Sequence, residues 1–366
     1  MNALVHARQQ AQLAFAASDA NLVVGEASAC PLPPAALATM TPADPCVVEQ
    51  FSGGLTARVL HLCIEGVHYT LKQRREEALV RNIDGQTSFL NEVQRRADFT
   101  RLKADPAWAG RFDHIVPTLY ADYRQGIILS PWLPGQAPTQ LDADLFDQLL
   151  STMVACEEAG LMEWDLCPGN LLVDQGHLWL FDFGYMYPFD PLHHYNSNGL
   201  SDPLFHACER FETRFFFGWL LNQALPMEAQ LALYRQLKQV ALTHYAGKRA
   251  HLAARGAIPD VLAWLDELMA RWQQALASPS ALAACFELEA FRSHVLDIED
   301  DLHGQSCTAT TLKRIDFVCQ ALTHRHAALA AGGALFYDNA GRDQASLLAL
   351  YAHKRQQAQG WLLPGH

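Results

Sequence analysis

The sequence predicts a mixed α+β protein, with a small antiparallel sheet toward the N-terminal end and a larger, mostly helical part after it. Between residues 47 and 131, short apolar runs alternate with polar residues and are separated by glycine-containing turns, which is typical of antiparallel strands. After Gly135, apart from one hairpin, apolar residues recur at helical spacing. A chain of 366 residues is long enough for two lobes with a sizeable core.

Composition excludes several classes of protein. Half of the residues are hydrophobic and 18% are charged, so most of the chain is expected to fold. No apolar run reaches transmembrane length, so we expect no membrane insertion. The net charge of −12, without a basic stripe, argues against nucleic acid as a partner. Nine single cysteines, an odd number without a zinc-like spacing, favour reduced thiols and a cytoplasmic location.

Residues 1–46 are predicted to be an N-terminal extension. A short helix over residues 1 to about 20 is followed by an Ala/Pro-rich segment through Pro45, which we expect to be irregular and draped on the body. Two roles stay open for this extension. A passive segment is favoured over a regulatory arm.

Residues 47–133 are predicted to form the sheet and one helix. Three strands follow one another, with Gly53-Gly54 between the first two and a Glu65-Gly66 turn between the second and third. Two further runs around Gln125-Gly126 complete a five-stranded sheet. Glycines at 53 and 54 would let backbone N–H groups approach phosphate oxygens, although such a pair is also an ordinary turn.

Two helices flank these strands in the sequence. Phe89, Val93, Phe99 and Leu102 are spaced along one side of a predicted helix, which Thr87 or Ser88 could cap. A second predicted helix follows Gly135, with Asp142 or Asp144 near its start and Gly160 after its end.

The stretch from Glu163 to Gly184 carries the candidate chemistry, in the sequence EWDLCPGNLLVDQGHLWLFDFG. Two apolar runs joined by Gln175-Gly176 predict a tight hairpin, which would return Asp182 to the end where Asn170 and Asp165 lie. A base and two oxygen ligands for Mg²⁺ would then share one site, as phosphoryl transfer requires.

This stretch resembles the catalytic and metal-binding loops of the protein kinase-like phosphotransferases. It is most similar to the aminoglycoside/choline kinase-like branch, whose run is typically HGDLHPGN followed by a hairpin and Asp-Phe/Trp-Gly. The resemblance extends over about residues 47–190 and implies a bilobal fold, with a small lobe of antiparallel sheet plus helix and a larger helical lobe over 134–366. The departure is Glu163-Trp164, which stands where the family usually has His-Gly.

The resemblance also implies roles for individual residues. Asp165 would be the catalytic base, and Asn170 and Asp182 would hold Mg²⁺. Lys72 would bind the α- and β-phosphates of ATP, beneath the Gly53-Gly54 loop. Glu92 is favoured over Glu76 and Glu77 as the carboxylate that orients it. Pro131 and Leu133 would hold adenine through their backbone carbonyl and amide.

Beyond Gly184, a short turn-rich segment leads into predicted helices over 203–225, 227–254, 258–277, 280–302, 308–331 and 341–358. The segment lacks Ala-Pro-Glu and a long phosphorylatable loop, which favours a small-molecule kinase over a regulated protein kinase. The acidic group Asp297, Glu299, Asp300 and Asp301 is interpreted as a solvated helix face.

The sequence therefore predicts an ATP- and Mg²⁺-dependent phosphotransferase that phosphorylates a hydroxyl of a small molecule. Two alternatives are kept: a protein Ser/Thr kinase of atypical type, and a non-catalytic nucleotide-binding pseudokinase or scaffold.

Overall fold

The computed structural model describes residues 2–51 and 53–363. Contacts divide the chain into two compact units, unit 1 (residues 1–203) and unit 2 (residues 204–366). The lobe boundary predicted after residue 133 lies inside unit 1 and stays a prediction. The prediction of a mixed α+β protein is confirmed, with the antiparallel sheet near the N-terminus and helices toward the C-terminus.

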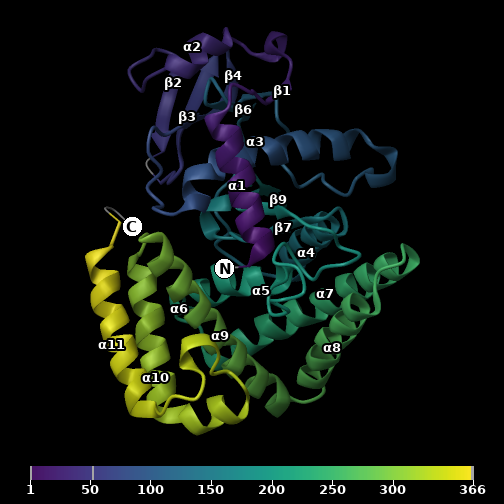
Figure 1. The fold of residues 1–366 in the computed structure, drawn as a ribbon, viewed down its shortest axis with the longest axis vertical. Coiled ribbons are helices and arrows are strands. Elements are labelled where there is room, and N and C mark those ends of the chain that lie inside the picture. Colours follow the sequence, from purple (N-terminus) through teal and green to yellow (C-terminus); the bar gives the residue numbers. More distant parts are fainter. Residues whose placement is uncertain (1, 52, 364–366) are drawn as a thin grey trace. The chain divides into compact units, whose positions relative to one another are not determined.

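A six-stranded antiparallel sheet forms the upper part of unit 1 (Figure 1), in the order β1-β5-β6-β4-β3-β2. Its strands are β1 (Val23–Gly25), β2 (Val47–Phe51), β3 (Ala57–Ile64), β4 (Val67–Arg74), β5 (Tyr120–Asp122) and β6 (Ile127–Pro131). The five predicted strands are present. The sixth, β1, pairs with β5 and was not predicted. The Pro-rich segment that ends at Pro45 was expected to be irregular but contains a helix at Pro34–Thr39, so that expectation is wrong in part.

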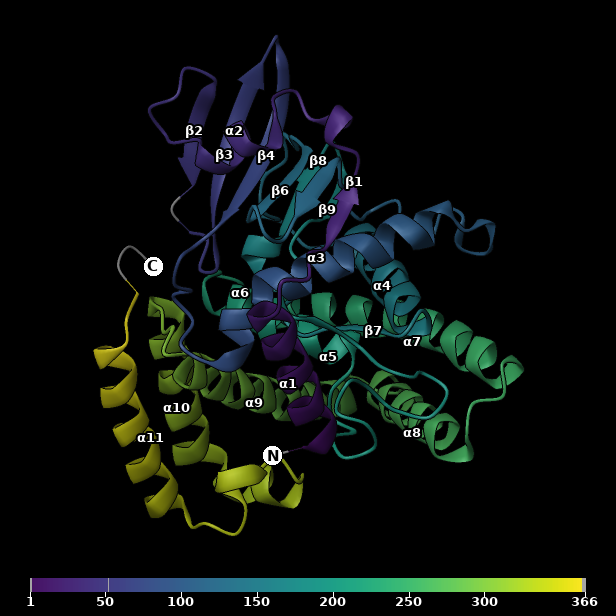
Figure 2. The same ribbon diagram turned by 45° about the horizontal axis from the view of Figure 1, so that its top comes forward.

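The N-terminal segment supplies structure to both faces of the sheet. Helix α1 (Ala3–Ala17) contacts α3 (Ile83–Ala104), and side chains of this segment join the core that Phe89, Leu90 and Val93 of α3 form with the sheet. Helix α2 (Pro34–Thr39) covers the other face, where Leu37 packs with apolar residues of β3, β4 and β6. Figure 2 shows α1 and α3 side by side, as in Figure 1. Residues 2–46 therefore contribute to the folded core of unit 1.

Helix α3 starts earlier than predicted. Its cap is Asn82, whose side chain accepts a hydrogen bond from the Gly85 N–H at 2.7 Å. Thr87 and Ser88, the predicted caps, lie inside the helix and donate to the carbonyls of Ile83 and Gly85. Sequence spacing located the apolar side of the helix but not its first turn, because that turn contains Gly85 and few apolar residues.

The second half of unit 1 contains the predicted hairpin. Its elements are α4 (Ala143–Glu158), β7 (Leu161–Glu163), the 3₁₀ turn η3 (Pro168–Asn170), β8 (Leu171–Asp174), β9 (His177–Leu180) and β10 (Met186–Pro188). Strands β8 and β9 pair across Gln175-Gly176, both with positive φ, as the tight hairpin requires. Strands β7 and β10 pair with Glu163 opposite Met186, on either side of the candidate loops.

Unit 2 is helical over its described residues, 204–363. Its helices are α5 (Ala207–Phe211), the π-helix η4 (Glu212–Phe216), α6 (Phe217–Leu221), α7 (Met227–Ala254), α8 (Pro259–Leu276), α9 (Pro279–Gly304), α10 (Ala309–Ala331) and α11 (Gln344–Gly360). The six predicted helical spans match these positions closely. The aromatic residues of α5, η4 and α6, among them Phe211, Phe215 and Phe216, are buried as core.

The prediction for the acidic group of unit 2 is wrong for two of its members. Asp297 and Asp301 are buried on α9 at 6% and 9% exposure. Each is paired: Asp297 forms an ion pair with Arg314 at 2.6 Å, and both aspartates form ion pairs with Arg214. A run of carboxylates reads as a solvated face in the sequence because the arginines that pair with it lie on other helices.

The start of α4 supplies a test of local structure. Asp142 caps the helix by accepting the Leu145 N–H at 2.9 Å, whereas Asp144 lies in the first turn, and both are exposed. We expect Asp142→Ala to lower the free energy of unfolding by about 1 kcal/mol. Asp144→Ala removes only a favourable charge near the helix N-terminus and is expected to cost about 0.3–0.5 kcal/mol.

Urea unfolding of both variants and the native chain measures the difference. Equal losses for the two aspartates would contradict the assignment of Asp142 as the cap.

Candidate active site

The sheet, α3 and the hairpin bring together Lys72, Glu92 and Asp182, and all three residues lie in unit 1. Lys72 lies on β4, with Val59 of β3 and Ile128 of β6 as its register partners, and faces α3. Its ammonium group contacts both carboxylate oxygens of Glu92, at 2.9 and 3.1 Å. The predicted Lys72–Glu92 pair is therefore present, and Glu76 and Glu77 have no part in it.

The Lys72 ammonium also reaches the hairpin. It donates to Oδ2 of Asp182 at 2.7 Å, and the other oxygen, Oδ1, accepts the Gly184 N–H at 3.1 Å. Lys72 and Glu92 are nearly fully buried, whereas the Asp182 side chain is 29% exposed. One face of the Asp182 carboxylate is therefore open to solvent while its other side is held by protein.

Arg96 completes this cluster and was not predicted. Its guanidinium donates to Glu92 Oε1 at 2.8 Å and to the Phe181 carbonyl at 2.5 Å. Arg96 lies one helical turn after Glu92, and this spacing was the signal in the sequence that could have identified it. The carboxylate of Glu92 is thus shared between two cations, which offsets its burial.

These charges set the pKa values of Lys72 and Asp182. Burial alone would lower the pKa of Lys72, but the carboxylates of Asp182 and Glu92 outweigh it and the net pKa is raised. For Asp182, burial alone would raise the pKa, and the Lys72 charge and hydrogen bonds bring it below its ordinary value. Lysine and aspartate are therefore both charged at neutral pH, as phosphate and metal binding require.

Asp165 and Asn170 lie together on the loop after β7. The Asn170 amide nitrogen donates to the Asp165 carbonyl at 2.8 Å and contacts the Asp165 carboxylate at 3.4 Å. Pro168 and Gly169 form the 3₁₀ turn that fixes this approach, and the Asn170 N–H closes it on the Cys167 carbonyl. The amide nitrogen of Asn170 is thus used within the loop, so Oδ1 is the atom of this side chain that could bind a metal ion.

Glu163 lies beneath this loop, in the position that departs from the family pattern. It is 5% exposed, and its Oε1 accepts the Asp165 N–H at 2.7 Å, while Oε2 is buried without a hydrogen-bond partner among the described residues. Burial raises the pKa of Glu163 well above its ordinary range. The carboxylates of Asp165 and Asp182 raise it further, and backbone N–H groups of Asp165 and Trp164 oppose this.

The other predicted nucleotide-binding residues, Gly53, Gly54, Pro131 and Leu133, lie at or near the ends of strands. Gly54 lies between β2 and β3, where a Cβ would stand 2.2 Å from the Ala57 carbonyl oxygen, so a larger residue does not fit; its own carbonyl accepts from Arg75. Gly53 is exposed, and Ser52 before it lies outside the described residues. Pro131 ends β6, and Leu133 follows two residues later.

Trp132, between Pro131 and Leu133, packs on the sheet. Its ring stacks on His61 at 3.6 Å between centroids with planes 6° apart, and Phe51 lies beyond at 5.8 Å. By register, His61 and Phe51 lie on the same face of the sheet as Lys72. Trp132 therefore extends the surface that carries Lys72.

The donor set fits Mg²⁺ and a nucleotide. Mg²⁺ prefers carboxylate and amide oxygens and usually binds through one or two protein ligands plus water and substrate phosphates. Asp182 and Asn170 offer such oxygens, and Lys72 offers a cation for phosphate. Within the described residues there is no cluster of three or more His, Cys, Asp or Glu that could hold a metal without such a substrate.

Comparisons with known proteins add little to this geometry. No protein-family model matches the chain, and no curated protein matches it. Among the solved structures that match is the "Medium resolution structure of the bifunctional kinase-methyltransferase WbdD", with 16% identity and a TM-score of 0.29. That match covers 58% of this chain and 52% of the other, so it spans about half of each protein and carries no argument about activity. None of the helices in the described ranges combines the length and hydropathy needed to cross a bilayer.

Glu163 leads to a prediction about pH and stability. An acid whose pKa is raised on folding keeps its proton in the native state while the unfolded chain loses it, so native stability falls as the pH rises above the unfolded pKa of about 4.5. Glutamine at 163 keeps the acceptor for the Asp165 N–H and has no proton to lose. Between pH 5 and 8 we expect Glu163→Gln to gain stability relative to the native chain, by up to about 1.4 kcal/mol per pH unit below the folded pKa.

Thermal or urea unfolding across this pH range measures the difference, with the exposed Glu77→Gln as the matched control. Parallel curves for the native chain and Glu163→Gln would show that the buried carboxyl titrates normally.

Proposed function

We propose that the protein is an ATP- and Mg²⁺-dependent phosphotransferase with the bilobal protein kinase-like fold, which transfers the γ-phosphoryl group to a hydroxyl of a small molecule. The observation that carries this proposal is the double contact of Lys72, with Glu92 on α3 and with Asp182 on the hairpin. It unites three segments, β4, α3 and the end of β9, at a single cation. Such an arrangement positions a phosphate-binding lysine beside a metal-binding carboxylate.

Each residue of the site has a defined task in this proposal. Lys72 binds phosphate oxygens, and Glu92 and Arg96 hold its side chain in place. Asp182 and Asn170 supply the oxygens that bind Mg²⁺. When bound, Mg²⁺–ATP provides the phosphoryl group and the positive charge that offsets charge on the phosphates. Asp165 accepts the proton that the acceptor hydroxyl loses as its oxygen bonds to phosphorus, and ADP is the leaving group.

Asp165 is held for this task by groups on both sides. Glu163 accepts its backbone N–H, and Asn170 donates to its backbone carbonyl, so the main chain at the base is fixed in two directions. A positioned base contributes about 10²–10⁴ in rate. The Glu163 carboxyl thus supports the loop, which is the role expected of the histidine that the family usually has at this position.

The short connection after Asp182 favours a small acceptor. Strand β10 starts at Met186 and pairs at once with β7, so the chain after Gly184 returns to the catalytic loop within two residues. The following segment to Pro203 is turn-rich and is tied to that loop by the Trp164 indole, which donates to the Ser197 hydroxyl at 2.9 Å. This compact segment contrasts with the long activation loops of regulated protein kinases.

The test separates nucleotide binding from chemistry. Native protein is expected to bind ATP in the presence of Mg²⁺ and to hydrolyse it slowly. Asp165→Asn is expected to bind within about twofold of native affinity and to lose about 10²–10⁴-fold in turnover. Asp182→Asn is expected to lose the part of the affinity that depends on Mg²⁺. Calorimetry with and without Mg²⁺ and single-turnover ATP cleavage supply the readouts.

Asp174→Asn is the control, because Asp174 lies on the same hairpin, at the far end of β8 from Asn170. Folded native protein that binds no nucleotide would refute the proposal. Binding without turnover across a panel of hydroxyl compounds would favour a pseudokinase or scaffold. Phosphate incorporated into serine or threonine of the chain itself would favour a protein kinase.

A further inference from the structure

Asn91, the residue before Glu92 on α3, holds the segment after Asp182. Its side-chain nitrogen donates to three backbone carbonyls: Phe183 at 3.1 Å, Gly184 at 3.0 Å and Met186 at 2.7 Å. Asn91 is 1% exposed. A buried primary amide thus cross-links the helix that carries Glu92 to the turn that carries Asp182.

The other end of the Asn91 amide is held by the N-terminal helix α1. Asn91 Oδ1 accepts a hydrogen bond from Gln12 Nε2 at 3.1 Å, and Gln12 is 5% exposed. Gln12 Oε1 in turn accepts from Arg8 at 3.3 Å and lies 3.2 Å from the Thr87 hydroxyl oxygen. The oxygen and the nitrogen of both side-chain amides, Asn91 and Gln12, therefore have hydrogen-bond partners that are buried or half-buried.

This chain of bonds fixes the orientation of the Asn91 amide. A rotation that exchanged its oxygen and nitrogen would point Oδ1 at three carbonyl oxygens and the nitrogen at the Gln12 donor. Without Gln12, Oδ1 is a buried acceptor with no partner, a state that costs about 1–3 kcal/mol. By donating to Oδ1, Gln12 avoids this free-energy cost in the orientation in which Asn91 binds the carbonyls of the turn.

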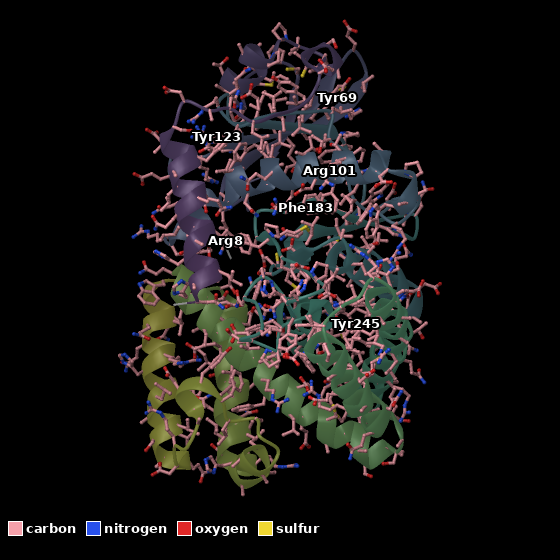
Figure 3. All side chains as sticks on the ribbon, turned by 45° about the vertical axis from the view of Figure 1, so that its right-hand side comes forward. Arg8, Tyr69, Arg101, Tyr123, Phe183 and Tyr245 are labelled. Atoms are coloured by element: carbon pink, nitrogen blue, oxygen red, sulfur yellow. The ribbon has the colours of Figure 1, made fainter. Side chains whose placement is uncertain are left out.

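Helix α1 is anchored on both sides of Gln12. Arg8 pairs with Asp84 of α3 at 3.0 Å, and its guanidinium lies 3.5 Å from the centre of the Tyr187 ring on β10. At the other end, Phe15 packs edge-on against Tyr123. Figure 3 labels Arg8, on α1, and Tyr123, which Phe15 of α1 contacts. The helix therefore contacts α3 and the strand that follows the Asp182 turn at the same time.

We propose that Gln12 and Asn91 are positioning residues of the phosphoryl-transfer site, and that α1 is a built-in element which holds the Asp182-Phe183-Gly184 turn against α3. This inference rests on the proposed function for its catalytic consequence, and on the hydrogen bonds alone for its structural part. Glu92 of α3 and Asp182 of the turn both contact the Lys72 ammonium, so the Asp182–Lys72 contact depends on the position of the turn relative to α3. The Gln12–Asn91 pair is the buried polar connection through which α1 contributes to that arrangement.

The experiment compares two glutamine substitutions on one helix. Gln12→Leu removes the donor to Asn91, whereas Gln10→Leu makes the same change at an exposed position of α1. Hydrogen–deuterium exchange of peptides covering residues 182–187 reports on the turn without any nucleotide. Calorimetry of ATP with and without Mg²⁺ reports on the site.

We expect about tenfold faster exchange over 182–187 and about tenfold weaker Mg²⁺-dependent ATP affinity in Gln12→Leu, which corresponds to one unsatisfied buried acceptor. ATP affinity without Mg²⁺ and the exchange of peptides from unit 2 are expected to stay as in the native chain. Gln10→Leu is expected to match the native chain in every readout.

A purely structural role for Gln12 would lower the melting temperature and leave local exchange and Mg²⁺ dependence unchanged, and that result would overturn the inference. If Gln12→Leu does not fold, Gln12→Met, which keeps an unbranched side chain of similar length, supplies the same comparison. If native protein binds no nucleotide, the exchange measurement still decides the structural part, and only the proposed function has failed.

Discussion

The buried ion pair between Lys72 and Glu92 is the constraint on which the site depends. Two charges removed from water are tolerable only if each keeps its partners, and leaving one unpaired costs about 3–5 kcal/mol. Arg96 and Asp182 supply the further contacts. The pair therefore ties the position of α3 to the sheet on one side and to the hairpin on the other, and a shift of any one of these three segments breaks a charged contact.

Helix α3 buries polar and charged side chains as well as apolar ones. Its apolar side packs on the sheet, yet Asn91, Glu92, Arg95 and Arg96 on other sides are also buried. Each of them binds a group on another segment or on the helix itself: Asn91 and Arg95 reach carbonyls near Gly184, and Glu92 reaches Lys72. The polar residues on the buried sides of α3 are tolerated because α1, β4 and the hairpin supply their partners. Helix α3 is therefore the element that connects these parts of unit 1.

Patterns within short stretches predicted much of this arrangement. The hairpin, five of the six strands and the helices of unit 2 follow from periodicity and turn residues, and the pairing of Lys72 with Glu92 was expected from the resemblance. The burial of Asp297 and Asp301 was not predicted, because their arginine partners lie on other helices. Gln12 was equally hard to predict, because a glutamine on a short helix is expected to be solvated until the asparagine 79 positions later is placed beside it.

The position of α1 in the sequence also has a consequence for how unit 1 assembles. Helix α1 and strand β1 leave the ribosome well before β5, α3 and β10, the segments on which they dock. An isolated helix of 15 residues is only marginally stable in water, so it stays largely unstructured until those partners emerge. Such contacts between distant parts of a chain slow folding. The region around Lys72 and Asp182 would then be complete only after α1, which is made before α3 and β10, has docked on them.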